Sequence, residues 1–150
     1  AVVRNASAAL VLMHMRGKPE NMQTGDLAYD DVMLDIIRNL QTGVQKAVAA
    51  GIGRNQILVD PGIGFGKTYE DNCKIIGRLR ELKVLGLPVL VGASRKAFIG
   101  KFTGGGTSER LEGTAATVAA AIMNGCHIVR VHDVAAMKKV AAMTDAMIHA

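Results

Sequence analysis

Four short apolar runs, each followed by a segment with helical spacing, constrain the fold of this chain more than any other feature. The runs cover residues 9–13, 57–59, 88–91 and 127–131, and none of them alternates cleanly between apolar and polar positions. Runs of this kind are typical of parallel strands that are covered on both faces. We therefore expect four buried strands, each leading into a helix.

The segments between the runs carry apolar residues at helical spacing, and the first three end at glycines. They predict helices over residues 29–50, 70–85, 108–124 and 134–148, with Ser108 as the N-cap of the third. A strand–helix order repeated four times indicates βα units, right-handed crossovers and a parallel sheet. The length of 150 residues suits one domain.

The segments that follow the strands are rich in glycine and basic residues, whereas the joints that lead back into strands are short. Two of these segments, residues 17–25 and 98–107, are long, and we expect both to be mobile loops. Ligands of such folds bind at the carboxyl ends of the strands. We therefore expect the chemistry in these segments.

Composition excludes several classes of protein. With 49% hydrophobic and 21% charged residues the chain is not disordered, and its apolar runs are too short to cross a membrane. The net charge is +5, but aromatic residues make up only 3% and the basic residues are scattered, so we expect a small anionic ligand and no nucleic acid. Cys73 and Cys126 are expected to be reduced core thiols of a cytoplasmic protein, with a disulfide or metal pair as the alternative.

Residues 60–67 (DPGIGFGK) follow the second run. Three glycines at alternate positions would let the backbone approach a ligand closely. Asp60 ends an apolar strand, so its carboxylate is partly withdrawn from water and has to accept hydrogen bonds. It either meets the N–H donors of a ligand or caps the following turn. The stretch lacks the spacing of a P-loop.

Basic side chains follow the third run, in residues 92–96 (GASRK). Gly92 leaves room where a side chain would block a pocket, and Ser94 can start a helical turn. Arg95 and Lys96 are adjacent and so point in different directions. The segment indicates an anion site, or else a helix start with solvated cations.

Arg130 and His132 end the fourth run. Strand alternation puts them on one face, where a guanidinium and an imidazole can converge on an anion or a planar ring. The alternative is a structural ion pair for an arginine inside an apolar strand. Met13 and His14 end the first run, and they are weaker signals because methionines usually fill cores.

Four segments together resemble the dihydropteroate synthases in order and spacing: LMHMRG at 12–17, DPGIGFGK at 60–67, GASRK at 92–96 and RVHD at 130–133. The resemblance covers the whole chain but only the second half of that family's (βα)8 barrel. It implies an α/β fold with strands five to eight of a TIM barrel, four strands and four helices, and an absent N-terminal half. Because the sequence starts at Ala1, we expect a fragment that forms a single domain.

The resemblance implies a transferase of folate biosynthesis, which condenses p-aminobenzoate with a 7,8-dihydropterin-6-ylmethyl diphosphate and releases diphosphate. Sulfonamides target this family. The resemblance also implies a Mg²⁺ cofactor, with its ligand in the absent half and no metal ligand in this chain. Both substrates are small molecules. We expect the isolated chain to be inactive.

The resemblance assigns roles to individual residues of this chain. Those with catalytic roles are Lys96, Arg130 and His132. Those that contact the pterin are Met13, Asp60, Gly64, Phe65, Gly92, Lys96 and Arg130. Phe65, Ser94 and Arg95 border p-aminobenzoate, and Arg130 and His132 bind the diphosphate.

Two alternatives stay open. The pterin-binding domain of a cobalamin-dependent methyltransferase would share the fold, but it has no diphosphate to hold, so the basic segments 94–96 and 130–132 favour the synthase. The other alternative is a non-catalytic half-barrel. Four parallel strands leave two open edges and an apolar face, so we expect self-association as a homodimer.

Overall fold

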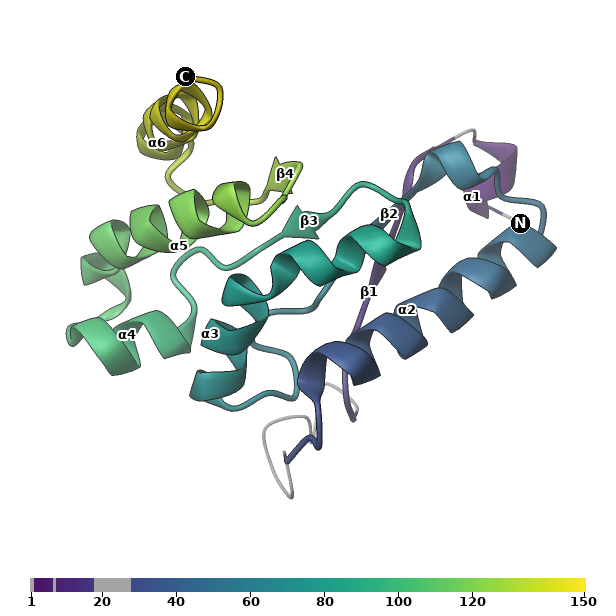
Figure 1. Cartoon of the computed structure of the whole chain (residues 1–150), viewed down its shortest axis with the longest axis horizontal. Coiled ribbons are helices and arrows are strands. Elements are labelled where there is room, and N and C mark those ends of the chain that lie inside the picture. The colour runs from purple at the N-terminus through teal and green to yellow at the C-terminus, as the bar shows by residue number, and fades with distance from the viewer. Residues whose placement is uncertain (1, 7, 18–27) are drawn as a thin grey trace.

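A computed structural model describes residues 2–6, 8–17 and 28–150 (Figure 1). In chain order the elements are α1 (Val2–Asn5), β1 (Leu10–Met13), α2 (Val32–Ala49), the 3-10 helix η1 (Arg54–Gln56), β2 (Ile57–Asp60), α3 (Tyr69–Gly77), the 3-10 helix η2 (Leu79–Leu85), β3 (Leu90–Val91), α4 (Ala97–Thr103), the 3-10 helix η3 (Thr107–Glu109), α5 (Leu111–Met123), β4 (Ile128–Val129) and α6 (Val134–Ile148). Within these residues, no helix combines the length and the apolar character needed to cross a lipid bilayer.

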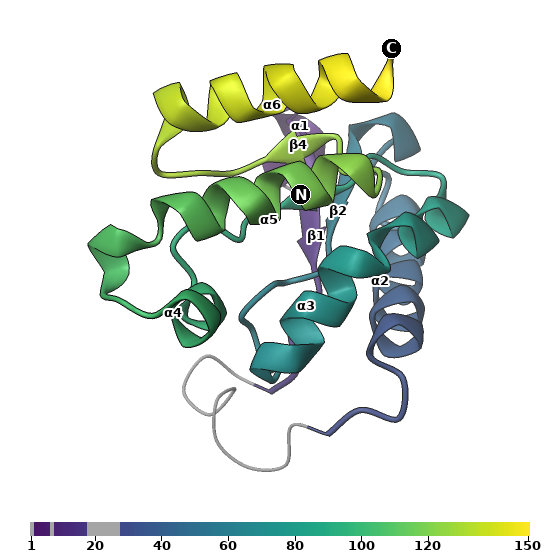
Figure 2. The ribbon, with the colours of Figure 1, turned by 60° about the vertical axis from the view of Figure 1, so that its left-hand side comes forward.

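The strands are parallel and follow the order of the chain. β1 pairs with β2, so that Met13 lies beside Asp60, and β3 pairs with β4. A single bridge between Val59 and Val89 joins the two pairs. Helices connect successive strands, and α6 lies beside α5 (Figures 1 and 2). The predicted α/β fold with parallel strands is confirmed.

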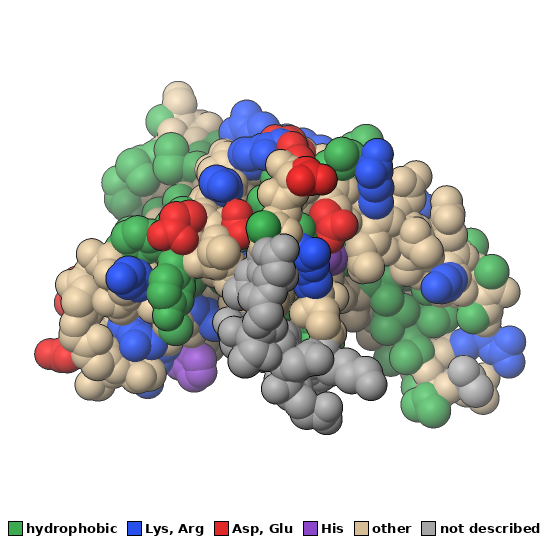
Figure 3. Space-filling view, turned by 90° about the horizontal axis from the view of Figure 1, so that it is seen from below, with side chains coloured by type: hydrophobic (Ala, Val, Ile, Leu, Met, Phe, Trp, Pro, Cys, Tyr) green, Lys and Arg blue, Asp and Glu red, His purple; other side chains and the backbone are tan. Residues whose placement is uncertain are grey.

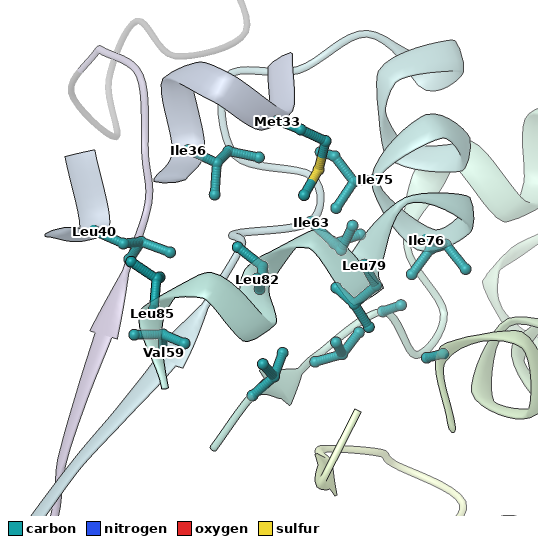
Figure 4. Packing of buried hydrophobic residues seen from close by; sticks show 14 of the residues in the cluster. Met33, Ile36, Leu40, Val59, Ile63, Ile75, Ile76, Leu79, Leu82 and Leu85 are labelled. Atoms are coloured by element: carbon teal, nitrogen blue, oxygen red, sulfur yellow. The ribbon is translucent and has the colours of Figure 1, made fainter. Parts of the chain in front are cut away.

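The hydrophobic core lies between the strands and the helices α2, α3 and η2 (Figure 4). Asp31 caps the N-terminus of helix α2. Its carboxylate accepts hydrogen bonds from the N–H groups of Met33 (2.9 Å) and Leu34 (3.3 Å). The apolar residues of α2 recur at helical spacing and face inward. The largest apolar side chains that are less than 2% exposed are Met33, Ile36, Leu40, Ile57, Ile63, Ile75, Leu79, Leu82, Val59, Val89 and Val91.

Two outer strands are less covered than the sequence predicts. In β1, Leu10 and Leu12 pack against the core, whereas Val11 is 43% and Met13 38% exposed. In β4, Ile128 is 41% exposed. The prediction of strands covered on both faces is therefore wrong for β1 and β4, because no described segment closes over these side chains.

The predicted helix over 70–85 is interrupted. Helix α3 ends at Gly77 and η2 follows, with Arg78 between them. The guanidinium of Arg78 donates to both oxygens of Asp31 (3.1 and 3.0 Å) and to Glu81. These contacts hold Arg78 at the N-terminus of α2. Arg78 and Asp31 are far apart in the sequence, so the local spacing of apolar residues could not predict this contact or the helix break.

The segment 98–107 is mostly helical, so the prediction of a mobile loop is wrong there. Residues 97–103 form α4, which buries Phe98 and Ile99 in the core. Ser108 lies within η3 and does not cap α5, which begins after Arg110. Of the other predicted loop, residues 17–25, all but Gly17 lie outside the described residues.

Both cysteines are free, but they differ in burial. Cys126 is partly buried against the core, whereas Cys73 is exposed on α3. The prediction of two core thiols is wrong for Cys73, because α3 turns Ile75 and Ile76 toward the core and leaves the cysteine on its outer side.

Candidate substrate-binding site

A pocket of about 250 Å³ opens at the carboxyl ends of β3 and β4. Residues 92–96 follow β3 and residues 130–132 follow β4, and neighbouring parallel strands bring their ends together. The structure thus brings these two segments together. The pocket is lined by Gly92, Ser94, Lys96, Arg130, Val131 and His132.

Gly92 provides room for the side chain of Arg130. A Cβ atom at Gly92 would lie 2.9 Å from Nη2 and 3.0 Å from Nε of Arg130, so any larger residue would displace the guanidinium. Arg130 itself is exposed, since β4 ends at Val129. The assumption that this arginine sits inside an apolar strand is therefore wrong. Arg130 makes no ion pair with any residue of the described chain, so the alternative of a structural ion pair finds no support among these residues.

Ser94 links the end of β3 to the end of β4. Its Oγ accepts a hydrogen bond from the backbone N–H of His132 (3.2 Å) and lies 3.0 Å from Nδ1 of the same residue. Ser94 is only 5% exposed. The prediction that Ser94 starts a helical turn is wrong, because α4 begins only at Ala97 and the hydroxyl is used across the strands.

Arg95 and Lys96 point in different directions, as predicted. The Arg95 guanidinium donates from Nε and Nη2 to the two oxygens of Asp133 (3.0 and 2.6 Å). This hydrogen-bonded pair raises the pKa of Arg95 and lowers the pKa of Asp133. Lys96 places Nζ 4.2 Å from the centre of the Phe65 ring. Arg95 therefore forms an ion pair with Asp133 of the same chain, whereas Lys96 lines the pocket.

Asp60 lies at the carboxyl end of β2 and is 5% exposed. One carboxylate oxygen accepts a hydrogen bond from the N–H of Gly62 (2.7 Å), and the other accepts none from the described residues. Burial raises the pKa of Asp60, while the Gly62 hydrogen bond and the charges of Arg130, Lys67 and Lys96 act to lower it. One oxygen thus caps a turn, as one interpretation of Asp60 predicts. The contact of the second oxygen with a ligand stays a prediction.

The other residues assigned to the pterin lie next to Asp60 or Lys96. Met13 is the register partner of Asp60 at the end of β1. Phe65 lies under the Lys96 ammonium, and a Cβ atom at Gly64 would lie 3.1 Å from Cδ of Lys96. The structure therefore brings these side chains into one region at the strand ends.

Two of the three alternate glycines approach the chain's own backbone. Gly62 has φ +71°, and a Cβ there would lie 1.8 Å from the carbonyl oxygen of His14. Gly66 has φ +64°, and a Cβ there would lie 2.4 Å from the carbonyl oxygen of Arg16. The prediction that all three glycines make room for a ligand is wrong for these two. They allow residues 60–67 to pack against the segment after β1.

A buried polar cluster behind this loop was missed by the sequence analysis. Lys67 is 3% exposed, and its Nζ donates to the carbonyl oxygens of Gly62 (2.9 Å) and Phe65 (2.9 Å) and to Nδ1 of His14 (3.0 Å). Since Nδ1 accepts, His14 carries its proton on Nε2, which donates to Asp35 (3.2 Å). Two features of the sequence could have indicated this cluster. His14 directly follows the first strand, and Lys67 ends the glycine-rich segment after the second.

Burial shifts the pKa of both bases in this cluster. It lowers the pKa of Lys67 to about 8. Burial, followed by the charge of Lys67, lowers the pKa of His14 to about 4, against the opposing effect of Asp35. His14 is therefore neutral at pH 7, and the cluster braces the loop that carries Asp60.

A larger hollow, of about 570 Å³, lies at the end of β1. Two carboxylates in its wall are already paired with protein groups: Asp31 with Arg78, and Asp35 with His14. Acidic and basic side chains also alternate on the face shown in Figure 3, with no continuous basic stripe. We place the candidate site at the smaller pocket, because the segments 92–96 and 130–132 line it.

No group of three or more His, Cys, Asp or Glu side chains within the described part of the chain is placed to hold a metal ion. The Mg²⁺ that the family resemblance implies stays a prediction, because magnesium sites often use only one or two protein carboxylates together with substrate phosphates.

Known proteins resemble this chain in sequence. Residues 1–132 match the family of pterin binding enzymes. The dihydropteroate synthase of Bacillus subtilis is 43% identical over 149 residues, which cover 99% of this chain and 50% of that protein. The Escherichia coli K12 enzyme is 45% identical over 123 residues, covering 82% of this chain and 43% of its own.

Solved structures agree. A dihydropteroate synthase of Yersinia pestis with a sulfonamide drug complex superposes with a TM-score of 0.94 at 39% identity, over 97% of this chain and 53% of that one. The Thermus thermophilus enzyme in complex with 6HMPPP gives 0.90 at 36% identity, over 98% and 58%. The chain spans about half the length of the curated relatives it matches. With a family match over most of its length and the strand-end pocket described above, the chain belongs to the pterin binding enzymes.

Proposed function

We propose that this chain is the substrate-binding half of a dihydropteroate synthase. One observation carries the proposal: Asp60, Lys96, Arg130 and His132 converge at one end of the parallel strands. A buried carboxylate beside three basic groups suits a substrate that has N–H donors at one end and a diphosphate at the other. Proteins similar to this chain in sequence and in structure carry that name.

The fold proposal is that residues 1–150 form one domain and supply the last four βα units of an eight-stranded barrel, the first four being absent from this chain. The parallel strands in chain order support it, and so does the exposed face of β1. The match to about half of the Yersinia pestis chain is also consistent with it.

At the pterin end, the second oxygen of Asp60 would accept hydrogen bonds from the amino and ring N–H groups of the substrate. The Asp60 carboxylate is mostly closed to water, so these hydrogen bonds replace hydration that burial has removed. The Lys96 ammonium, held over Phe65, would donate to the polar ring edge. Met13, Gly64 and Gly92 would line the slot, together with the Arg130 guanidinium.

At the diphosphate end, Arg130 and His132 would bind the phosphate oxygens. The proposed reaction breaks the bond between the methylene carbon and the diphosphate oxygen, and the amine nitrogen of p-aminobenzoate forms the new bond and then loses a proton. Negative charge grows on the departing diphosphate. Fixed positive and N–H groups beside it lower the energy of that step, which gives Arg130 and His132, with Lys96, their catalytic roles.

For the p-aminobenzoate end we propose Phe65, Ser94 and Arg95 as the border. Phe65 offers an aromatic ring. The hydroxyl of Ser94 and the guanidinium of Arg95 are already bonded to His132 and Asp133. We therefore propose that Ser94 and Arg95 shape the border of the p-aminobenzoate site and do not form hydrogen bonds with the substrate.

Calorimetry tests the proposal with two ligands, the dihydropterin diphosphate and the same pterin carrying a hydroxyl in place of the diphosphate. Arg130→Ala should weaken the first about tenfold or more, through loss of a charge-assisted hydrogen bond, and should weaken the second less, because that ligand loses only the contact of the guanidinium with the pterin. Asp60→Asn should weaken both, because one acceptor oxygen becomes a donor that faces N–H groups.

Lys138→Ala is the matched control, since it removes one exposed positive charge on α6, outside the pocket. It should bind like the wild type. Equal affinities for the wild type and Arg130→Ala would contradict the proposal. Absence of binding to the wild-type chain would show that these residues do not suffice to hold the substrate. A preference for the ligand without diphosphate would favour the methyltransferase alternative.

A further inference from the structure

We propose that Ser94 is a positioning residue that fixes the tautomer and the ring orientation of His132, so that His132 presents an Nε2–H group to the pocket. The inference deepens the function proposed above. It rests on that function for the identity of the anion, diphosphate, but the tautomer itself follows from the hydrogen bonds of Ser94.

The Ser94 hydroxyl has one proton to donate and lone pairs to accept with. The backbone N–H of His132 can only donate, so its hydrogen bond to Oγ (3.2 Å) uses a lone pair. The hydroxyl proton has no other acceptor among the described residues, so we assign it to the second contact, to Nδ1 of the His132 ring (3.0 Å). A neutral imidazole that accepts at Nδ1 carries its proton on Nε2.

The tautomer decides what the pocket offers an anion. Nε2 of His132 makes no hydrogen bond with the described residues, and His132 lines the pocket together with Arg130 and Lys96. An Nε2–H group adds a donor to these two cations. The opposite tautomer would turn a lone pair toward phosphate oxygens and repel them.

Ser94 can impose this orientation because its own position is fixed. The next residue, Arg95, has φ +58°, an unfavourable conformation for a residue other than glycine. Its N–H donates to Oγ1 of Thr114 (3.1 Å), and its carbonyl oxygen accepts from Arg110 (2.9 Å). The Arg95–Asp133 pair then runs beside the Ser94–His132 contact, so two adjacent links join the same two segments.

Nitrogen-15 NMR of the His132 ring, recorded at a pH where titration shows the ring to be neutral, tests the tautomer without any substrate. In the wild-type chain we expect the proton on Nε2 and an Nδ1 shift typical of a hydrogen-bond acceptor. Ser94→Ala should admit a measurable Nδ1–H fraction and a more mobile ring. Ser94→Thr, which keeps the hydroxyl, should restore the wild-type spectrum.

Inorganic diphosphate, titrated into the same samples, tests the consequence for binding. Ser94→Ala should bind it about fivefold more weakly, the effect of losing one oriented donor, and Ser94→Thr should bind like the wild type. Arg130→Ala should weaken diphosphate binding without changing the tautomer of His132. This result would separate the effect of the Arg130 charge from the effect of the His132 ring orientation.

A proton on Nδ1 in the wild type would overturn the inference, and so would a Ser94→Ala spectrum identical to that of the wild type. A tautomer change in Ser94→Ala with unaltered diphosphate affinity would overturn the role in binding. If the wild type binds no diphosphate while the tautomer responds to Ser94→Ala, the proposed function fails and the tautomer assignment holds.

Discussion

Acidification from pH 7 to pH 4 is expected to remove about 3 kcal/mol of the free energy of unfolding through His14 alone. His14 is 1% exposed, and its pKa falls from 6.5 to about 4 on folding. Between these two values the unfolded chain binds a proton that the folded chain does not. Stability therefore rises with pH across this window and is lost as the pH falls through it, at about 1.4 kcal/mol per pH unit.

The structure explains why His14 resists protonation. Its Nδ1 already accepts from the Lys67 ammonium, so a proton there would remove the acceptor and set two cations against each other in a buried site. Asp35 on the other side of the ring favours the charged form, but it is itself half exposed and cannot offset burial.

Urea unfolding of the wild type and of His14→Asn, at a series of pH values between 7 and 4, measures this effect. Asparagine does not titrate, and its carboxamide oxygen can replace Nδ1 as the acceptor for Lys67. The stability difference between the two proteins should change by about 3 kcal/mol over this range, in favour of the variant at low pH. Asp60, whose raised pKa acts in the opposite direction, is common to both and cancels. Identical pH profiles for the two proteins would refute the reasoning.

Two further predictions concern packing and assembly. Gly62→Ala should destabilise the chain by about 3 kcal/mol or more, because its Cβ would meet the His14 carbonyl oxygen at 1.8 Å with φ at +71°. Gly77→Ala at the end of α3, where a Cβ meets nothing within 4 Å, is the control and should be neutral or slightly stabilising; equal thermal unfolding of the two variants would contradict this. The open strand edges and the exposed Val11 and Ile128 predict self-association as a homodimer, and sedimentation velocity showing only monomer across concentrations would exclude it.

Features that depend on local pattern were predictable. Branched apolar runs located all four strands, and the rule that ligands bind at the carboxyl ends of parallel strands directed attention to the segments that carry Lys96 and Arg130. The different directions of the Arg95 and Lys96 side chains were predictable from the adjacency of these residues in the sequence.

Features that depend on distant partners were not predictable. The break between α3 and η2 depends on Arg78 reaching Asp31, and the close approach of Gly62 depends on the position of His14. Lys67 ends a glycine-rich loop and can be buried because three acceptors surround its ammonium group. Only the tertiary fold brings those acceptors together.

Among the described residues a single bridge, between Val59 and Val89, joins the two strand pairs. The sheet therefore consists of two halves that meet at a seam with little hydrogen bonding. Asp60 belongs to the half formed by β1 and β2, while Arg130 and His132 belong to the half formed by β3 and β4. The span between carboxylate and cations is therefore set less by a hydrogen-bonded ladder than by the packing of apolar side chains beneath the seam. Core substitutions there could tune the width of the site, and so the size of ligand it accepts, without altering any residue that touches the ligand.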